Sequence, residues 1–548
     1  ATASWGLLGV ADPNQPATPN KPQLAVAKDT ARKDPLRFVK AALRAVMTAR
    51  SLNFTYTRSN GTLLPGYMPS TRFFGLSNYG TTGLAPGVPF ILGQQYSSIS
   101  QLNDLYNIAN TNGWYTTQSQ YLNTPLSSLL TENITARTTL EPFRGFNVQL
   151  DARYQRTKNQ EAYFRNAVDT TAAAYQVSGE LVPYSNRRLA AVQALGTGSF
   201  SVSTITIQTH FGDLGANGET SKAFNQFVKN REIVQQRLQA ANPVQPGTTS
   251  GLYSYNAQDV LIQSFLDAYH GKSSDGYEAK NFNPFGVIPL PNWRLDYNTF
   301  ADLPGMRDLF RSFTINHAYT SVYTLGGYTT ATGYNRADGT PYEPDLATSS
   351  LPYLRNNSGQ YVPYYVVGQV SILESLTPLL GVNFQTLNNV TGRLQYSTSR
   401  AVALNTTNAQ VTELRTSDIT IGLGYASTGL KLPFRVGGEQ RVLKNNLQAR
   451  LDLNIRDNTT IQRSILGSVD PVPAVTGTPA VVGIVGEPTS QITNGALSIQ
   501  LRPTVDYLLN TRLNLQFYYT QTITQPRVSN AFRNATSEGG IQLRYSLQ

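Results

Sequence analysis

The side chains that most often carry chemistry are few and scattered in this sequence. The three histidines, His210, His270 and His317, lie far apart, and none stands in a spacing such as H-E-x-x-H. Zinc usually needs three or four clustered ligands, and the chain has no cysteine. Carboxylate pairs such as Asp302 and Asp308 have no spacing that implies joint acid–base work. We therefore predict that the chain is not an enzyme and holds no cofactor or metal.

Two further site types are excluded by their missing motifs. The sequence has no phosphate-binding loop of the form G-x-x-x-x-G-K-[ST], and residues 457–460 lack the D-x-[DN]-x-[DN]-G pattern of a calcium loop. The net charge of +11 would suit nucleic acid, but the basic residues are dispersed along predicted strands and no binding motif accompanies them. Nucleic acid is therefore not an expected partner.

Composition points to elements that place polar and apolar residues alternately. Charged residues make up 14% of the chain, against roughly 25% in soluble domains, while tyrosine (31) and glycine (43) are abundant. No run of about 18 apolar residues exists, and the longest candidate, 475–485, is broken by glycine and proline. A membrane β-barrel and a soluble β protein remain.

Alternation with a period of two dominates from Ser51 onwards. We expect one set of side chains to line a wet lumen: Gln448, Arg450, Asp452, Asn454, Arg456, Arg512, Asn514, Gln516, Gln542 and Arg544. Their neighbours form the set expected to face lipid: Leu447, Leu451, Leu453, Leu513, Leu515, Phe517, Leu543 and Tyr545. A soluble sandwich would bury these apolar faces, whereas a barrel turns them to lipid.

The predicted fold class is all-β: a transmembrane antiparallel β-barrel wall of about twelve strands, as part of a much larger barrel, with a small helical periplasmic insertion. The strands are expected near residues 51–58, 132–140, 146–156, 199–209, 311–324, 365–388, 390–407, 415–427, 446–457, 496–507, 511–521 and 539–547. A phase slip near Thr204 and the proline at Pro378 predict bulges or bends.

The connections divide the chain into four parts. Residues 1–50 are predicted to form a linker and an amphipathic helix, 51–209 barrel strands with long extracellular loops, 210–310 the periplasmic insertion, and 311–548 barrel strands to the C-terminus. Short and long connections alternate if the C-terminus is periplasmic, with the stretch 210–310 as the one exception. That stretch has two helical patterns, with Ser221 and Asn256 as expected caps and Gly271 ending the second.

The insertion also supplies a candidate periplasmic docking surface. It consists of Phe265, Leu266 and Tyr269 on the second helical pattern and of Pro291, Asn292 and Trp293 in a rigid proline-rich segment. Packing at the lower rim of the barrel is the alternative role, and the sequence favours neither role over the other.

Six segments in this order resemble the SprA/Sov family of the type 9 secretion system. They are 64–70 (LPGYMPS), 85–93 (APGVPFILG), 288–297 (IPLPNWRLDY), 311–319 (RSFTINHAY), 374–381 (ESLTPLLG) and 449–458 (ARLDLNIRDN). The resemblance covers most of residues 50–548, and 540–548 looks like the family's C-terminus. It identifies the chain as similar to the C-terminal part of the family, whose members are much longer.

The resemblance implies a conduit for folded cargo across the outer membrane of a Gram-negative bacterium of the Bacteroidota. Family members form the largest single-chain barrels, with a known count of about 36 strands, so twelve would be about a third of the wall. The partners implied are the remainder of the same barrel, a PorV-type FadL-like barrel, a periplasmic plug protein, secreted cargo proteins and the lipid bilayer.

Two alternatives stay open at this point. One is a self-contained outer-membrane porin of about twelve strands, a count within the normal range. The other is a surface β-sandwich adhesin, in which the apolar faces would pack on each other.

Overall fold

A computed structural model of the chain describes most of the residues from 49 onwards. The described residues are 49–78, 84–96, 101, 104–105, 108–109, 111–114, 116, 124–168, 187–212, 221–241, 253–278, 285, 288–330, 363, 365–431, 442–465, 467–468, 484–485, 488–510, 512–528 and 531–547. The amphipathic helix predicted within residues 1–50 lies outside this set.

One antiparallel sheet of 13 strands makes up most of the described structure. Its strands are β1 (Ala49–Leu63), β4 (Leu126–Phe143), β5 (Phe146–Val168), β6 (Arg187–Ser203), β7 (Asn292–Tyr297), β8 (Phe310–Thr330), β9 (Tyr365–Thr386), β10 (Val390–Asn405), β11 (Gln410–Lys431), β12 (Val442–Ser464), β15 (Thr489–Asn510), β16 (Leu513–Pro526) and β17 (Asn534–Tyr545). The all-β, antiparallel prediction is confirmed.

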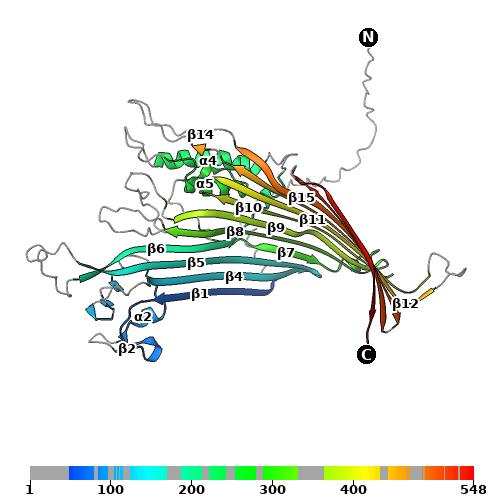
Figure 1. Cartoon of the computed structure of the whole chain (residues 1–548), viewed down its shortest axis with the longest axis horizontal. Coiled ribbons are helices and arrows are strands. Elements are labelled where there is room, and N and C mark those ends of the chain that lie inside the picture. The colour runs from blue at the N-terminus through cyan, green and yellow to red at the C-terminus, as the bar shows by residue number, and fades with distance from the viewer. Residues whose placement is uncertain are drawn as a thin grey trace, which may run out of the picture. The chain divides into compact units, whose positions relative to one another are not determined.

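The strands follow one another across the sheet in chain order, from β1 to β17 (Figure 1). They occupy twelve positions, because β6 and β7 share the place between β5 and β8. Each predicted strand corresponds to one position, and β7 is the strand that the sequence did not predict. Within the described residues β1 pairs only with β4 and β17 only with β16, so the sheet is open at both edges.

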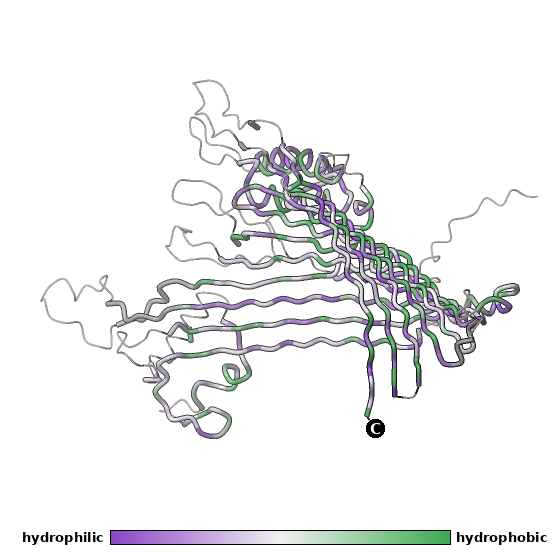
Figure 2. The backbone as a smooth tube through the Cα atoms, turned by 45° about the vertical axis from the view of Figure 1, so that its right-hand side comes forward, coloured by the Kyte–Doolittle hydropathy of each residue, from purple (hydrophilic) through white to green (hydrophobic). Residues whose placement is uncertain are grey.

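The connections alternate between two edges of the sheet. The long-loop edge holds the connections 64–125, 169–186, 331–364 and 465–488, and the short-turn edge holds 144–145, 387–389 and 511–512. The tube in Figure 2 shows that the strands change direction across the sheet, so the sheet is curved. Short turns fit the local signals: Gly145 has φ 78, and a Cβ there would meet Thr299 Cγ2 at 2.3 Å.

Two strands depart from regular pairing where the sequence predicted irregularity. Opposite Thr398 and Tyr396 of β10, β9 places Leu376 and Leu380, so two extra residues around Pro378 bulge from the ladder and the prediction for Pro378 is confirmed. The slip near Thr204 is different, because β6 ends at Ser203 and the chain leaves the sheet there. The irregularity predicted near Thr204 is therefore present as a bend of the chain out of the sheet, not as a bulge within the strand.

The chain leaves the sheet after β6 and returns at β7, with two helices between: α4 (Lys222–Ala241) and α5 (Gln258–Tyr269). Ser221 caps α4 as predicted, since its hydroxyl accepts a hydrogen bond from the Phe224 N–H at 3.3 Å. Asn256 does not cap α5. The residue before that helix is Ala257, and the Asn256 side chain instead accepts a hydrogen bond from Arg231. Gly271, with φ 74, follows the end of α5 as predicted.

The helices pack on one face of the sheet, towards the long-loop edge (Figure 1). Phe224, Phe227 and Phe265 share a buried core with strand residues such as Phe200 and Val402. The alternation of short and long connections predicted the insertion at the edge of the short turns, and this prediction is wrong. A single strand position is interrupted in its middle, and the connection at the short-turn edge is only 298–309.

Short elements complete the described structure: β2 (Ser77–Asn78), β3 (Leu84–Ala85), α2 (Val88–Ile91), β13 (Gly467–Ser468) and β14 (Ile484–Val485), with 3-10 turns at Phe73–Gly75, Ile207–Thr209, Ser274–Gly276 and Phe300–Asp302. None of the described helices is long and apolar enough to cross a membrane.

Candidate functional site

The two faces of the large sheet are chemically different, and they are the candidate functional site. We call the face on which α4 and α5 pack the helix face; it is marked by Phe200, Val202, Val402 and Val411 in their shared core. The opposite face is the polar face. Side chains alternate along a strand, and directly paired residues point to the same side, so the registers assign every strand residue to a face.

The residues predicted to face lipid all lie on the helix face. In β12 the alternation runs without a shift in the pairing to β11 from Ile461, which is buried on the helix face, down to Leu447. Leu515 pairs with Leu543 and continues the helix-face row of Tyr507 in β15. Leu513, two residues before Leu515 on the same side of β16, pairs with Tyr545. The full set is Leu447, Leu451, Leu453, Leu513, Leu515, Phe517, Leu543 and Tyr545.

The residues predicted to line the lumen come together on the polar face, with one exception. Asn514 pairs with Arg544 and Gln516 with Gln542, and Gln448, Arg450, Asp452, Asn454 and Arg456 occupy alternate positions of β12. The exception is Arg512, which lies in the turn before β16.

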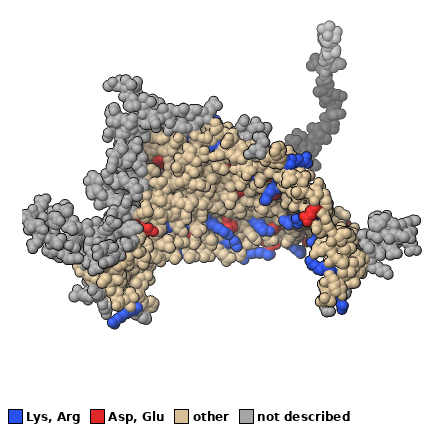
Figure 3. Space-filling model, in the orientation of Figure 1, with Lys and Arg blue, Asp and Glu red and all other residues tan. Residues whose placement is uncertain are grey.

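Ion pairs reinforce the polar character of this face. Arg137 reaches Asp151 at 3.2 Å and Arg456 reaches Asp418 at 2.9 Å, each between neighbouring strands. Figure 3 shows Lys, Arg, Asp and Glu side chains gathered over the half of the sheet towards the short turns.

On the helix face, the half near the short turns forms a continuous apolar band. The band is exposed, with Phe54 66%, Leu380 50% and Leu543 61% accessible, and it crosses all twelve strand positions. Its members are Leu52, Phe54, Tyr56, Ile134, Leu140, Val148, Leu150, Leu295, Ile315, Leu380, Val382, Leu394, Tyr396, Ile421, Leu423, Leu451, Leu453, Leu501, Val505, Leu515, Phe517, Ile541 and Leu543.

No Asp, Glu, Lys or Arg occupies a helix-face position in this half of the described strands. The polar face of the same stretches carries Arg137, Asp151, Arg153, Arg294, Asp296, Arg393, Asp418, Arg450, Asp452, Arg456, Arg502, Asp506 and Arg544. So sharp a division, with the apolar side left in contact with solvent, is the pattern of a strand wall between lipid and water.

Aromatic rings border the band at the short-turn edge. Phe143 stacks on Phe146 with centroids 4.9 Å apart, and Phe310 lies 5.1 Å from Phe313 and 5.5 Å from Phe384. Tyr425, Tyr507 and Tyr545 occupy corresponding helix-face positions in β11, β15 and β17. Aromatic girdles of this kind flank the apolar band of membrane barrels.

The predicted docking residues of the proline-rich segment instead close the break between β6 and β7. The Asn292 side-chain oxygen accepts a hydrogen bond from the Ser321 N–H at 2.8 Å, and Trp293 stacks on Tyr319 with centroids 4.3 Å apart. The indole N–H donates to His317 Nε2 at 3.2 Å. Pro291, which precedes β7, is exposed.

The predicted docking residues of α5 are turned towards the sheet. Phe265 and Tyr269 are fully buried, and Leu266 packs partly buried against the same core. This burial is what a packing role requires, and it leaves Phe265 and Tyr269 inaccessible to a partner.

A buried ionic network, which the sequence analysis missed, fixes the segment after β6 to the sheet. Glu374 accepts hydrogen bonds from Arg400 at 2.7 Å and from Tyr319 at 2.7 Å, and it lies 2.9 Å from His210 Nδ1. Arg400 also donates to the Thr209 carbonyl at 2.7 Å. A second buried pair, Glu413 with Arg463, lies on the next two strands, β11 and β12. The available signal was a charge at an apolar position, since Glu374 follows Val370 and Ile372 on one face.

His210 also lies 3.2 Å from Thr398, so Thr398, His210 and Glu374 resemble a hydrolase triad in their distances. Their chemistry differs from such a triad. Glu374 is fully buried and shared between His210, Arg400 and Tyr319, and His210 is 4% exposed, so a substrate has no approach to the imidazole. These contacts hold the segment that follows β6 against the sheet.

No protein-family model matches the chain. No curated protein matches it either. The two chemically different faces of the sheet are therefore the feature from which a function can be inferred.

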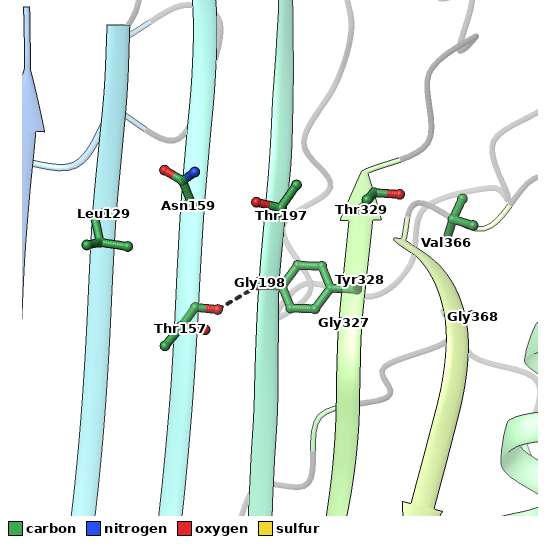
Figure 4. Close-up of a pocket in the computed structure, with 10 residues that line it drawn as sticks. All are labelled: Leu129, Thr157, Asn159, Thr197, Gly198, Gly327, Tyr328, Thr329, Val366 and Gly368. Carbon is green, nitrogen blue, oxygen red and sulfur yellow. Dashed lines mark hydrogen bonds between the residues drawn. The ribbon is translucent and has the colours of Figure 1, made fainter. Parts of the chain in front are cut away.

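A hollow of about 500 Å³ lies near the long-loop edge (Figure 4). Its floor includes Gly198, Gly327 and Gly368, and Tyr328 is its only titratable side chain. The residues that line it include no Asp, Glu, His, Lys or Arg. Among the described residues no group of three or more His, Asp or Glu side chains is placed to hold a metal ion.

Proposed function

We propose that this chain is a section of the wall of an outer-membrane β-barrel of the SprA/Sov type, which conducts folded proteins to the cell surface. The observation that carries the proposal is the apolar band, which is exposed and free of Asp, Glu, Lys and Arg. The opposite face is polar throughout and carries charged residues on eight of the twelve strand positions. In water such a band would be a large aggregation-prone surface, whereas in a bilayer it is the stabilising one.

The polar face then lines the lumen. Arg and Asp side chains spread over it keep a wide water-filled channel hydrated and offer no apolar patch that would retain a folded cargo protein. The channel has no nucleotide or metal chemistry in this proposal, so the energy for transport comes from elsewhere. A PorV-type barrel and a periplasmic plug protein are the further partners that the family resemblance implies.

The open edges support the idea that the rest of the wall lies elsewhere. The outer sides of β1 and β17 have no strand partner within the described residues. Unpaired backbone groups in hydrocarbon cost several kcal/mol each, so neither edge is stable in a bilayer. The remaining strands, from another part of the polypeptide or another chain, are therefore an obligatory partner.

The two alternatives make different demands on the structure. A porin of twelve strands requires β1 to pair with β17. A sandwich requires a second sheet over the apolar band, and besides the large sheet the described residues contain only two two-stranded sheets.

The decisive experiment is to determine the mass and subunit content of the native particle extracted with detergent. The proposal expects this chain within a particle that contains many more wall strands, and it expects residues 1–548 expressed alone to aggregate. A monomeric, heat-modifiable barrel of 60.0 kDa would establish the porin instead. Solubility of the native protein without detergent would establish the sandwich.

A further inference from the structure

Four of the strands are about twice as long as is needed to cross a bilayer. β9, β11 and β15 each have 22 residues, and β12 has 23. A tilted strand crosses the hydrocarbon core with about 9–11 residues. About half of each of these four strands therefore lies outside the bilayer, and the side chains on the helix face identify which half.

The change between the two halves is abrupt and can be followed on β10. Arg400 is 1% exposed and held in the ionic network, and Thr398 contacts His210. Two residues further on, Tyr396 is 38% exposed, and Leu394 after it is 47% exposed. The same step occurs on β9, from buried Leu376 to half-exposed Leu380.

On β6 and β8–β12 the half near the long loops cannot contact lipid, because the insertion covers it. We call the described residues 204–212, 221–241, 253–278, 285 and 288–290 the collar. Beneath it lie the charged pairs of Glu374 with Arg400 and Glu413 with Arg463. An arginine on the lipid face of a barrel is strongly destabilising at mid-bilayer, so these positions belong outside the hydrocarbon.

The collar turns a hydrophilic surface away from the sheet. The exposed residues of α4 include Lys222, Asn225, Lys229, Glu232 and Gln236, which recur at intervals of three or four along one side of the helix. Three large apolar residues of the collar depart from this pattern. Ile288 is 74% exposed and Leu290 is 39% exposed. Phe211, next to His210, is 59% exposed.

Resting on the proposed function, we infer that the bilayer covers only the short-turn half of the helix face and that the collar sits outside the barrel wall, just beyond the membrane on the long-loop side. Phe211 lies at the membrane interface, where aromatic side chains are preferred. The collar thereby seals the break between β6 and β7 from the outside and sets the depth at which the wall sits in the membrane.

The chain has no cysteine, so a single introduced cysteine can be labelled specifically. An environment-sensitive fluorophore would be attached at Leu453→Cys, Asn454→Cys, Phe211→Cys and Lys229→Cys, one at a time. The native particle would be reconstituted into phosphatidylcholine vesicles that contain either acyl-brominated lipid or lipid with a headgroup spin label, and aqueous iodide would be the third quencher. Leu423→Cys replaces Leu453→Cys if that variant does not assemble, because both lie in the band.

We expect brominated chains to quench the label at residue 453 several-fold more than the label at 454, which should respond to iodide. The label at 211 should respond most to the headgroup quencher, and the label at 229 to iodide alone. Equal responses at 453 and 454 would refute the proposed function. The expected contrast at 453 and 454, combined with a label at 211 untouched by both lipid quenchers or a label at 229 quenched by brominated chains, would refute the collar and leave the barrel standing.

Discussion

Asn292 bridges the gap in the sheet where the strand position between β5 and β8 is interrupted. Its side-chain oxygen accepts a hydrogen bond from the Ser321 N–H at 2.8 Å. Similar contacts surround it. Ser203 Oγ accepts the Arg153 N–H at 3.0 Å, and the Tyr319 hydroxyl accepts the Thr206 N–H at 2.8 Å. Side chains thus replace the ladder bonds that a continuous strand would make.

Replacing the Asn292 side chain should destabilise the sheet at the gap between β6 and β7. Asn292→Ala leaves the buried Ser321 N–H without its acceptor, which we expect to lower the free energy of unfolding by about 1–3 kcal/mol. The measurement is the urea midpoint for unfolding of the native particle in detergent. Asn53→Ala, at an exposed strand position, is the matched control and should change little. Equal midpoints for the two variants would contradict the role of Asn292.

The two faces should respond oppositely to the same added charge. Leu453→Arg places a cation in the apolar band and should cost about 2–4 kcal/mol if its position is near the middle of the bilayer. Asn454→Arg, one residue along on the polar face, should leave assembly nearly unchanged. The amount of protein assembled in the outer membrane measures both effects, and a larger loss for Asn454→Arg would mean that the faces are reversed.

Breaking the buried ion pair should be far more damaging than breaking an exposed one. Glu374→Gln leaves the Arg400 charge buried without a counter-ion, so we expect a loss of about 3–5 kcal/mol, first seen as protease sensitivity of the collar. Asp418→Asn removes the exposed partner of Arg456 and should cost about 0–1 kcal/mol. Equal protease sensitivity of the two variants would show that the network does not hold the collar.

The stability of the collar should fall on acidification because of His270. Burial lowers the pKa of His270 below its ordinary value of 6.5, and the neutral ring lies 2.6 Å from both the Leu266 carbonyl and Thr204 Oγ1. The unfolded histidine takes up a proton near pH 6.5 and the folded one only at lower pH. The unfolded state therefore binds more protons in this window, and stability is lost as the pH falls.

Hydrogen-exchange protection factors of α5 amides, compared at about pH 7.5 and 5.5, measure this effect. His270→Gln should remove most of the pH dependence. Burial raises the pKa of Asp259, which acts in the opposite direction, since that contribution is lost as the pH rises. Asp259 is present both in the unchanged protein and in His270→Gln, so its contribution to the pH dependence cancels when the two are compared. An unchanged pH dependence in His270→Gln would assign the effect to another group.

The sequence by itself determined the strands and the division of their side chains. Alternation is a local property with a period of two, so the polar and apolar residues of β12, β16 and β17 could be separated before any pairing was known. The cap at Ser221 and the irregularity at Pro378 were equally local.

Only the tertiary structure decided where the helices lie and what the break in the wall means. β7 has six residues preceded by Pro289 and Pro291, too short a pattern to be recognised as half of a strand. Its identity depends on pairing with β5 and β8. Glu374 meets His210 across 164 residues of sequence, and no local period encodes such a distance. Parity counts connections but cannot detect a strand that leaves the sheet in its middle, because that requires knowing which backbone groups pair across the gap.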